Sequence, residues 1–172
     1  MGDLGATAIA HRYAARLVWT GNLGTGTSDY TSYDRGYRVI VEGKPELVGS
    51  AHRAYRGDPA RHDPEDLFLA AISACHMLSY LSLCARRGIR VLSYEDEARG
   101  MLAVVPGGGG RFAEVMLRPS VTVAPGADEA LALALHDVAH DRCFIANSCS
   151  VPIRHEATVR IGEEAAPAGD GA

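Results

Sequence analysis

The longest apolar run of the chain lies near its middle and predicts a helix over residues 63–88. Asp63 can cap the start of this helix with a side-chain oxygen, and Pro64 fits the first turn, where a missing N–H costs nothing. Gly88 suits the left-handed position that follows many helices. Apolar side chains cover nearly every face between these ends, so the pattern predicts a helix that is buried all round.

A membrane span is the first alternative for this segment, because the apolar run is about long enough to cross a bilayer. Small polar and histidine side chains interrupt the run at every third residue, and charged residues crowd both ends; the interruptions are Ser73, His76, Ser79 and Ser82. These features favour a helix in the core of a soluble protein, and we expect no membrane partner.

Shorter segments rich in alternating or β-branched residues predict strands on both sides of the helix. They cover residues 9–20, 37–42, 89–105 (one long strand or two), 111–123 and 151–161. The glycine-rich segment 106–110 predicts a hairpin tip, residues 128–142 predict a second helix, and 143–149 a short turn. The order β-β-α-β-β-α-β predicts an α+β class with an antiparallel sheet and two helices. We expect one domain over residues 1–172, with an ordered core at about 9–162 and flexible tails.

The central helix poses a packing problem, because one short sheet covers only one of its faces. A second copy of the chain would cover the rest, so the pattern predicts an obligate dimer with this helix near the interface. The alternative is that the second helix and the loops bury it within one chain.

Composition narrows the functional classes. A hydrophobic content of 47% and a charged content of 22% are ordinary for a soluble globular protein. The net charge of −4 and the absence of a basic run argue against a nucleic-acid partner. The N-terminal segment lacks the pattern of a signal peptide, so we expect a cytoplasmic location. In a reducing compartment the four cysteines are catalytic, metal-binding or simply buried, rather than structural disulfides: Cys75, Cys84, Cys143 and Cys149.

Cys75 lies in the middle of the predicted helix, in an apolar setting that suppresses the thiolate unless a cation lies nearby. His76 points about 100° away around the helix. The nearest cations in the sequence precede the helix: Arg35, Arg53, Arg56 and Arg61. Glu65 lies about 15 Å from Cys75 along the helix axis, so it would have to reach this thiol from a partner chain.

A metal or small-ligand site is the alternative to thiol chemistry. His136, His140 and Cys143 share one stripe of the second predicted helix, and Cys75 could complete a tetrahedral site with them. The pattern is weak, because paired histidines at this spacing are common on ordinary surfaces. The competing interpretation is a solvated His136 and a His140 whose charge stabilises the C-terminal end of the helix.

Several segments together resemble the OsmC/Ohr family of thiol-dependent peroxide reductases (osmotically inducible protein C and organic hydroperoxide resistance protein). They are YDRGY at 33–37, GSA at 49–51 with RGDP at 56–59, DPEDLF at 63–68 followed by SACHML at 73–78, and HDRCFIANS at 140–148. The resemblance spans residues 10–160 and preserves order and spacing. The residues around Cys75 and Cys143 are more similar to an OsmC-like subgroup than to the Ohr branch.

The resemblance implies an intertwined homodimer with its active sites at the interface. By this analogy Cys75 attacks the peroxide, and Cys143 resolves the resulting sulfenic acid. Arg35 would stabilise the Cys75 thiolate, and Glu65 would orient that arginine. An external dithiol of the lipoyl type would regenerate the enzyme, and no metal or other bound cofactor is implied. We therefore expect a stress-response enzyme that reduces organic hydroperoxides to alcohols.

Two departures from the family pattern affect these expectations. Asp63 stands where asparagine is usual, although either residue caps a helix. Phe144 follows Cys143 where many members have proline, and the extra thiol of Cys149 competes with Cys143 as the resolving group. The apolar surroundings of Cys75 predict a preference for bulky organic hydroperoxides over hydrogen peroxide, and Cys84 is expected to be a bystander.

Overall fold

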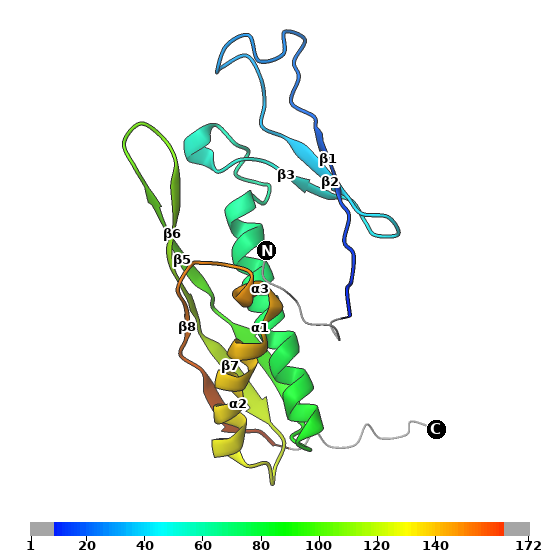
Figure 1. The fold of residues 1–172 in the computed structure, drawn as a ribbon, viewed down its shortest axis with the longest axis vertical. Coiled ribbons are helices and arrows are strands. Elements are labelled where there is room, and N and C mark those ends of the chain that lie inside the picture. Colours follow the sequence, from blue (N-terminus) through cyan, green and yellow to red (C-terminus); the bar gives the residue numbers. More distant parts are fainter. Residues whose placement is uncertain (1–8, 164–172) are drawn as a thin grey trace. The chain divides into compact units, whose positions relative to one another are not determined.

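A computed structural model describes residues 9–163 of the 172-residue chain (Figure 1). The chain divides into two compact units, Met1–Asp66 and Leu67–Ala172, and each is described by itself. The expected flexible tails lie outside the described residues, apart from Gly162 and Glu163, which carry no helix or strand. The single domain over residues 1–172 stays a prediction.

The first unit contains an antiparallel sheet in the order β1-β2-β3, formed by β1 (Arg16–Trp19), β2 (Tyr37–Ile40) and β3 (Leu47–Gly49). A 3-10 turn, η1 (Arg53–Tyr55), follows. Tyr37 pairs with Gly49, where a Cβ atom would lie 2.3 Å from the tyrosine ring, so glycine lets the ring cross β3. The sequence predicted β1 and β2 with wider bounds and missed β3, because three residues are too few to show an alternating pattern.

The central helix α1 (Pro64–Arg86) has both of the predicted ends. The Asp66 N–H donates to Asp63 Oδ1 at 2.9 Å, and the Asp63 N–H donates to Asp66 Oδ2 at 3.3 Å, which is a reciprocal cap. At the other end Gly88 has a φ of 70°, and the Ile89 N–H donates to the Cys84 carbonyl at 2.9 Å. The cap and the stop signal read from the sequence are therefore confirmed.

Burial along α1 follows one face in the single chain. The buried residues form a single stripe of Ile72, His76, Tyr80, Leu83 and Cys84, whereas Leu78 on another face is 63% exposed. Within the single chain only one side of the helix is covered, so burial on every face requires the second copy of the chain that the sequence predicts, and it stays a prediction. By length and composition α1 also qualifies as a membrane span, alone among the helices between residues 9 and 163, and core helices of soluble proteins pass the same criterion.

The second unit contains two three-stranded sheets, in the orders β4-β7-β9 and β5-β6-β8. Their strands are β4 (Val91–Asp96), β5 (Arg99–Val104), β6 (Gly110–Leu117), β7 (Pro119–Val123), β8 (Ile153–His155) and β9 (Thr158–Ile161). The β4/β7 and β5/β6 pairs are antiparallel, and β7/β9 and β6/β8 are parallel. The α+β class is confirmed, with mixed sheets in place of a wholly antiparallel one.

Each of the three long strands predicted in this unit is interrupted once. Asp96 ends β4, and its carboxylate accepts the Arg118 N–H at 2.7 Å, at the break between β6 and β7. The other carboxylate oxygen accepts a hydrogen bond from the Ser73 hydroxyl of α1. The Asp96 carboxylate thus satisfies the Arg118 N–H and the Ser73 hydroxyl at the break between the strands. The alternation of residues along a strand does not reveal such a contact.

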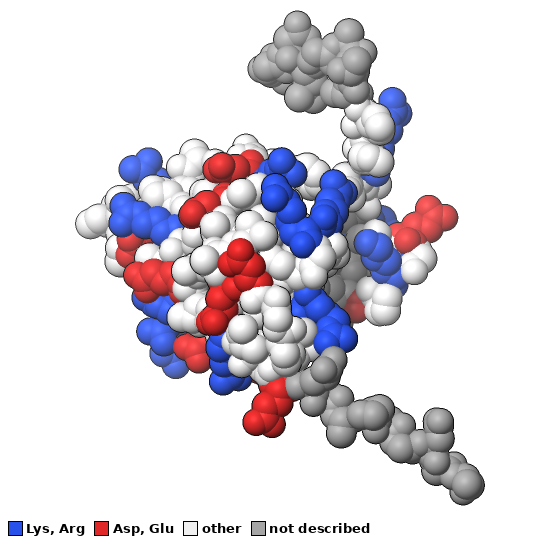
Figure 2. Space-filling view, turned by 90° about the horizontal axis from the view of Figure 1, so that it is seen from below, with Lys and Arg blue, Asp and Glu red and all other residues white. Residues whose placement is uncertain are grey.

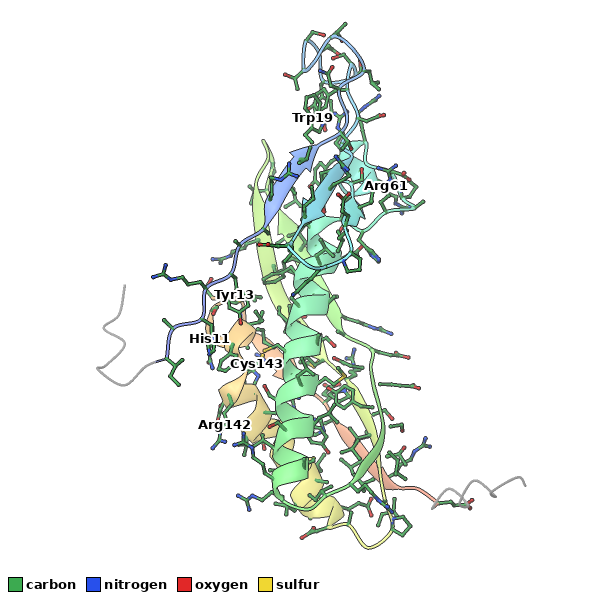
Figure 3. The ribbon with its side chains drawn as sticks, turned by 90° about the vertical axis from the view of Figure 1, so that its right-hand side faces the viewer. His11, Tyr13, Trp19, Arg61, Arg142 and Cys143 are labelled. Atoms are coloured by element: carbon green, nitrogen blue, oxygen red, sulfur yellow. The ribbon has the colours of Figure 1, made fainter. Side chains whose placement is uncertain are left out.

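Helix α2 (Glu129–Arg142) begins at Asp128, whose carboxylate accepts the Leu131 N–H at 2.9 Å, and α3 (Phe144–Asn147) follows it. Helices α1 and α2 lie side by side (Figures 1 and 3), and their buried residues form one core with β7. That core comprises Tyr80, Leu83, Cys84, Ile89, Val121, Val123, Ala132, Leu135 and Ala139. Basic and acidic side chains are interspersed on the face shown in Figure 2.

Candidate functional site

The second unit brings together the thiols of Cys75 and Cys143. Cys75 is half-buried on α1, and Cys143 is buried at the junction of α2 and α3, beside α1 (Figure 3). The Cys75 side chain lies close enough to Cys143 to raise the pKa of its thiol, and both cysteines are free thiols. Residues that are 68 positions apart in the sequence therefore form one dithiol site.

Local structure fixes the position of the Cys143 sulfur. Cys143 ends α2 with extended backbone angles and caps α3, where its Sγ accepts the Ala146 N–H at 3.5 Å. The Asn147 side chain ties this turn to the end of α2 by donating to the Asp141 carbonyl at 2.8 Å. The HDRCFIAN segment thus folds into a tight corner that directs one thiol toward α1.

Its surroundings keep the Cys143 thiol protonated. Burial, followed by the neighbouring Cys75 side chain, raises the pKa of Cys143 to about 11. Cys143 therefore keeps its proton at neutral pH.

The other two thiols have different surroundings. Cys84 is fully buried in the core, and burial raises its pKa, which suits an unreactive core residue. Cys149 is half-buried, and its S–H donates to the Ile145 carbonyl at 3.0 Å. It lies two residues beyond the end of α3 (Phe144–Asn147), and its competition as a resolving thiol stays a prediction.

Arg35 belongs to the first unit, where aromatic rings and backbone carbonyls hold its side chain. Its guanidinium carbon lies 4.1 Å from the ring centroid of Tyr33 and 4.4 Å from that of Tyr30. Two of its N–H groups donate to the carbonyls of the same residues, with a distance of 2.6 Å to Tyr30. Since Cys75 lies in the other unit, the stabilisation of its thiolate by Arg35 stays a prediction.

Glu65 lies in the first turn of α1, half-buried. It forms no ion pair and no side-chain hydrogen bond with any residue between 9 and 163, so the predicted pairing with Arg35 is not formed within this chain. Its charge acts on Tyr37, whose pKa is raised first by burial and then by Asp63 and Glu65. The orientation of Arg35 by a partner's glutamate stays a prediction.

Sequence reasoning missed a cluster of aromatic side chains behind the thiols. His76 Nε2 and His136 Nδ1 lie 3.0 Å apart, and the His136 ring stacks on Tyr80 at 3.8 Å between centroids. His136 is fully buried, so the expectation that it is solvated is wrong. His76 is next to Cys75 in the sequence and His136 lies on α2, so both were visible as candidate residues. Only the fold shows that they form a pair.

The metal-site alternative gains no support from this arrangement. Between residues 9 and 163 no group of three or more His, Cys, Asp or Glu side chains is placed to hold a metal ion. His136 instead bonds to His76, and the ring of His140 faces His155 at 5.9 Å. The helical stripe of His136, His140 and Cys143 is therefore divided among separate contacts.

Comparison with known proteins places the dithiol site in a family. The family model described as OsmC-like protein matches residues 57–157, which is more than half of the 172-residue chain. The chain belongs to the OsmC-like family. The matched segment contains Glu65, Cys75 and Cys143, and Arg35 precedes it.

Individual OsmC-like relatives agree with this assignment. An OsmC-like protein of unknown function from Vibrio cholerae is 30% identical, with a TM-score of 0.77 over 86% of this chain and 99% of that one. The uncharacterized protein YmaD of Bacillus subtilis is 27% identical over 159 residues, which is 90% of this chain and 98% of the relative. An organic hydroperoxide resistance protein from Elizabethkingia anophelis shares the fold, with 22% identity and a TM-score of 0.62 over 90% of this chain and 100% of that one.

Proposed function

We propose that this OsmC-like protein is a thiol peroxidase that reduces organic hydroperoxides to alcohols. The observation that carries the proposal is the contact between the half-buried Cys75 thiol and the buried, protonated Cys143 thiol. A dithiol in this arrangement can be oxidised to a disulfide without a large movement of the chain. The hydroperoxide resistance protein of similar fold supports the choice of substrate class.

In the first step the Cys75 thiolate attacks the terminal oxygen of the hydroperoxide. The O–O bond breaks, Cys75 becomes a sulfenic acid, and the leaving alkoxide takes a proton and departs as an alcohol. Arg35 would stabilise the thiolate and the developing alkoxide with its guanidinium. Its fixed position between Tyr30 and Tyr33 supports such a role, because a preorganised charge needs no rearrangement during the reaction.

In the second step the Cys143 sulfur attacks the Cys75 sulfenic acid. A Cys75–Cys143 disulfide forms, and the hydroxyl group of the sulfenic acid leaves as water with the proton of Cys143. The buried and protonated state of Cys143 suits a group that reacts second. An external dithiol, of the lipoyl type by the family resemblance, then takes up the oxidation by forming its own disulfide and restores both thiols.

We infer that the working form is a homodimer. The apolar helix α1 buries only one stripe in the single chain, and Leu78 is 63% exposed. A second chain would cover this surface and would supply a glutamate equivalent to Glu65 to an Arg35 side chain. Light scattering of the purified protein should give twice the chain mass of 18.2 kDa. An antioxidant role in stress would follow from the same chemistry, and the cytoplasmic location stays a prediction.

The proposal is tested by following the consumption of cumene hydroperoxide with dihydrolipoamide as the reductant. Cys75→Ser should abolish turnover, because serine provides no thiolate. Cys84→Ala is the matched control, since it removes another thiol from the same helix and should leave turnover in place. Full activity of Cys75→Ser would end the proposal.

A further inference from the structure

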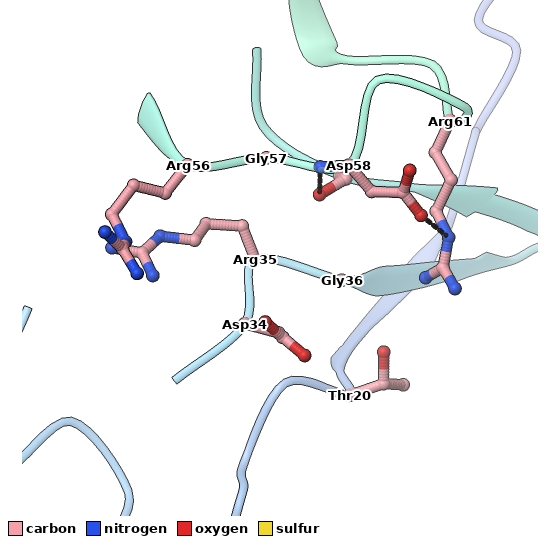
Figure 4. A pocket seen from close by; sticks show the side chains of 9 residues that line it. Thr20, Asp34, Arg35, Gly36, Arg56, Gly57, Asp58 and Arg61 are labelled. Atoms are coloured by element: carbon pink, nitrogen blue, oxygen red, sulfur yellow. Dashed lines mark hydrogen bonds and ion pairs between the residues drawn. The ribbon is translucent and has the colours of Figure 1, made fainter. Parts of the chain in front are cut away.

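A polar cavity of about 440 Å³ lies wholly within the first unit, and no cysteine lines it (Figure 4). The segments around residues 20, 34–36, 50 and 56–61 line it. Three of its lining residues are arginines and two are aspartates: Arg35, Arg56, Arg61, Asp34 and Asp58. The volume is within the range of small-molecule sites, and the polar lining suits a charged ligand.

The positive charges in this cavity are unequally compensated. Asp58 Oδ2 pairs with Arg61 Nε at 3.1 Å, and Asp58 Oδ1 accepts the Ala60 N–H at 2.9 Å, so this carboxylate is fully engaged. Asp34 directs its carboxylate toward the Thr20 side of the cavity, away from the guanidinium groups of Arg35 and Arg56 (Figure 4). Among residues 9–163 neither of these two arginines forms an ion pair with a carboxylate.

The guanidinium groups of Arg35 and Arg56 end in the same part of the cavity (Figure 4). Arg35 uses two of its five N–H donors on backbone carbonyls, which leaves the others available. Arg56 donates no side-chain hydrogen bond within the described part of the chain, so all N–H donors of its guanidinium group are available. Two like charges that line one cavity repel each other, and an anion bound there would reduce that repulsion.

The backbone that presents Arg56 is strained. Arg56 has a φ of 64°, the only positive value for a non-glycine residue between residues 9 and 163. The next residue, Gly57, packs so closely that an added Cβ would lie 1.5 Å from the Ala51 carbonyl oxygen. Ser50 is 1% exposed and accepts the Asp58 N–H at 3.0 Å, which anchors this wall. A long charged residue at a left-handed position points to a function for its side chain, because glycine would fit the backbone better.

We propose that Arg35 and Arg56 form a binding site for the oxyanion group, carboxylate or phosphate, of a small polar molecule. The planar forks of two guanidinium groups match the oxygens of such a group. Arg61 is held by Asp58 and shapes the far wall. This site shares Arg35 with the proposed peroxidase reaction but requires no reaction at the thiols, so anion binding is measured independently of turnover.

The test is a calorimetric titration of Cys75→Ser protein with inorganic phosphate and, in a second arm, with malonate, each against sodium chloride at equal ionic strength. Using the serine variant keeps thiol chemistry out of the readout, so a failure here is distinct from a failure of the peroxidase. We expect saturable binding in at least one arm, and the tighter arm identifies the group as phosphate or carboxylate. Absence of saturable binding in both arms overturns the proposal.

Variants then locate the site. Arg56→Gln should weaken binding at least tenfold, because it removes a charged, bidentate donor. Arg53→Gln is the matched control, since it makes the same charge change three residues away and outside the cavity lining. Arg56→Gly covers the case in which the glutamine variant does not fold, because glycine adopts the left-handed backbone without strain. Unchanged binding in Arg56→Gly, or equal losses in Arg53→Gln and Arg56→Gln, would contradict the assignment.

Discussion

His76 Nε2 and His136 Nδ1 lie 3.0 Å apart in the interior, with their rings stacked at an interplanar angle of 9°. The two residues are 1% and 0% exposed. They join α1, one residue after Cys75, to α2, which carries Cys143 at its end. One hydrogen bond connects two neutral imidazoles, and His76 Nδ1 and His136 Nε2 have no partner among the described residues. The packing of α1 against α2, which positions Cys75 and Cys143, therefore depends on both imidazole rings staying neutral.

The pair makes stability depend on pH. Burial first, and then neighbouring histidines, lowers the pKa of His76 from 6.5 to about 4 and that of His136 to about 3. The unfolded chain therefore binds more protons than the folded chain between pH 6.5 and about 4, so the free energy of unfolding falls as the pH falls through this window. Each imidazole contributes about 1.4 kcal/mol per pH unit. Urea unfolding at pH 7, 6, 5 and 4 measures the slope.

A variant isolates the contribution of the pair. His136→Phe keeps a ring against Tyr80 and removes one titrating group, so the slope between pH 6 and 4 should decrease by about one proton, or 1.4 kcal/mol per pH unit. The exposed His11, changed to Gln, is the control and should leave the slope as it is. An unchanged slope in His136→Phe would show that other groups cause the acid sensitivity.

Arg35→Ala should slow the reaction of the reduced protein with cumene hydroperoxide by about 100-fold, the usual effect of losing one preorganised donor to a developing negative charge. Stopped-flow measurement of the second-order rate constant tests this. Arg38→Ala removes an exposed arginine that pairs with Glu46, and it should change the rate little. Equal rates for wild type and Arg35→Ala would remove Arg35 from the mechanism.

Cys143→Ser should leave the first oxidation intact and stop the formation of the disulfide. A single equivalent of hydroperoxide should then leave a sulfenic acid on Cys75, which a dimedone adduct would reveal by mass spectrometry. Steady-state turnover with a dithiol should fall at least tenfold, because the preformed contact supplies a large effective concentration of the resolving thiol. Cys149→Ser should retain turnover, and the reverse pattern would make Cys149 the resolving thiol.

Asp63→Ala should destabilise the protein by about 1 kcal/mol, because the Asp66 N–H loses its cap at the start of α1. Asp63→Asn preserves an accepting oxygen and should cost a few tenths of that amount at most. Denaturant unfolding of the three proteins provides the comparison. A loss as large in the asparagine variant would show that the charge of Asp63, rather than its hydrogen bond, stabilises the helix.

Much of the fold was accessible from local signals. The cap at Asp63, the left-handed Gly88 and the hairpin tip at 106–110 each depend on residues close in sequence, and each is confirmed. The sequence left open whether residues 89–105 form one strand or two, but the break between β6 and β7 was not accessible, because it depends on the Asp96 carboxylate meeting Arg118 across the sheet. The parallel placement of β8 and β9 likewise depends on pairing rather than on periodicity.

The candidate site divides in the same way. The family resemblance singled out Cys75 and Cys143, and the fold puts them in contact. For His136 the spacing left two alternatives open, a metal ligand or a solvated side chain, and only the stacking of α1 against α2 explains its burial. The left-handed backbone of Arg56 could not be anticipated, since the segment Arg56-Gly57-Asp58-Pro59 suggests only a turn whose strained position is glycine.

The most direct test of the dithiol mechanism is a free-thiol count with intact mass, before and after one equivalent of cumene hydroperoxide is added to the fully reduced protein. The mechanism predicts the loss of two of the four thiols per chain, with peptide mapping to a Cys75–Cys143 disulfide. Four unreacted thiols after exposure to the hydroperoxide would contradict it.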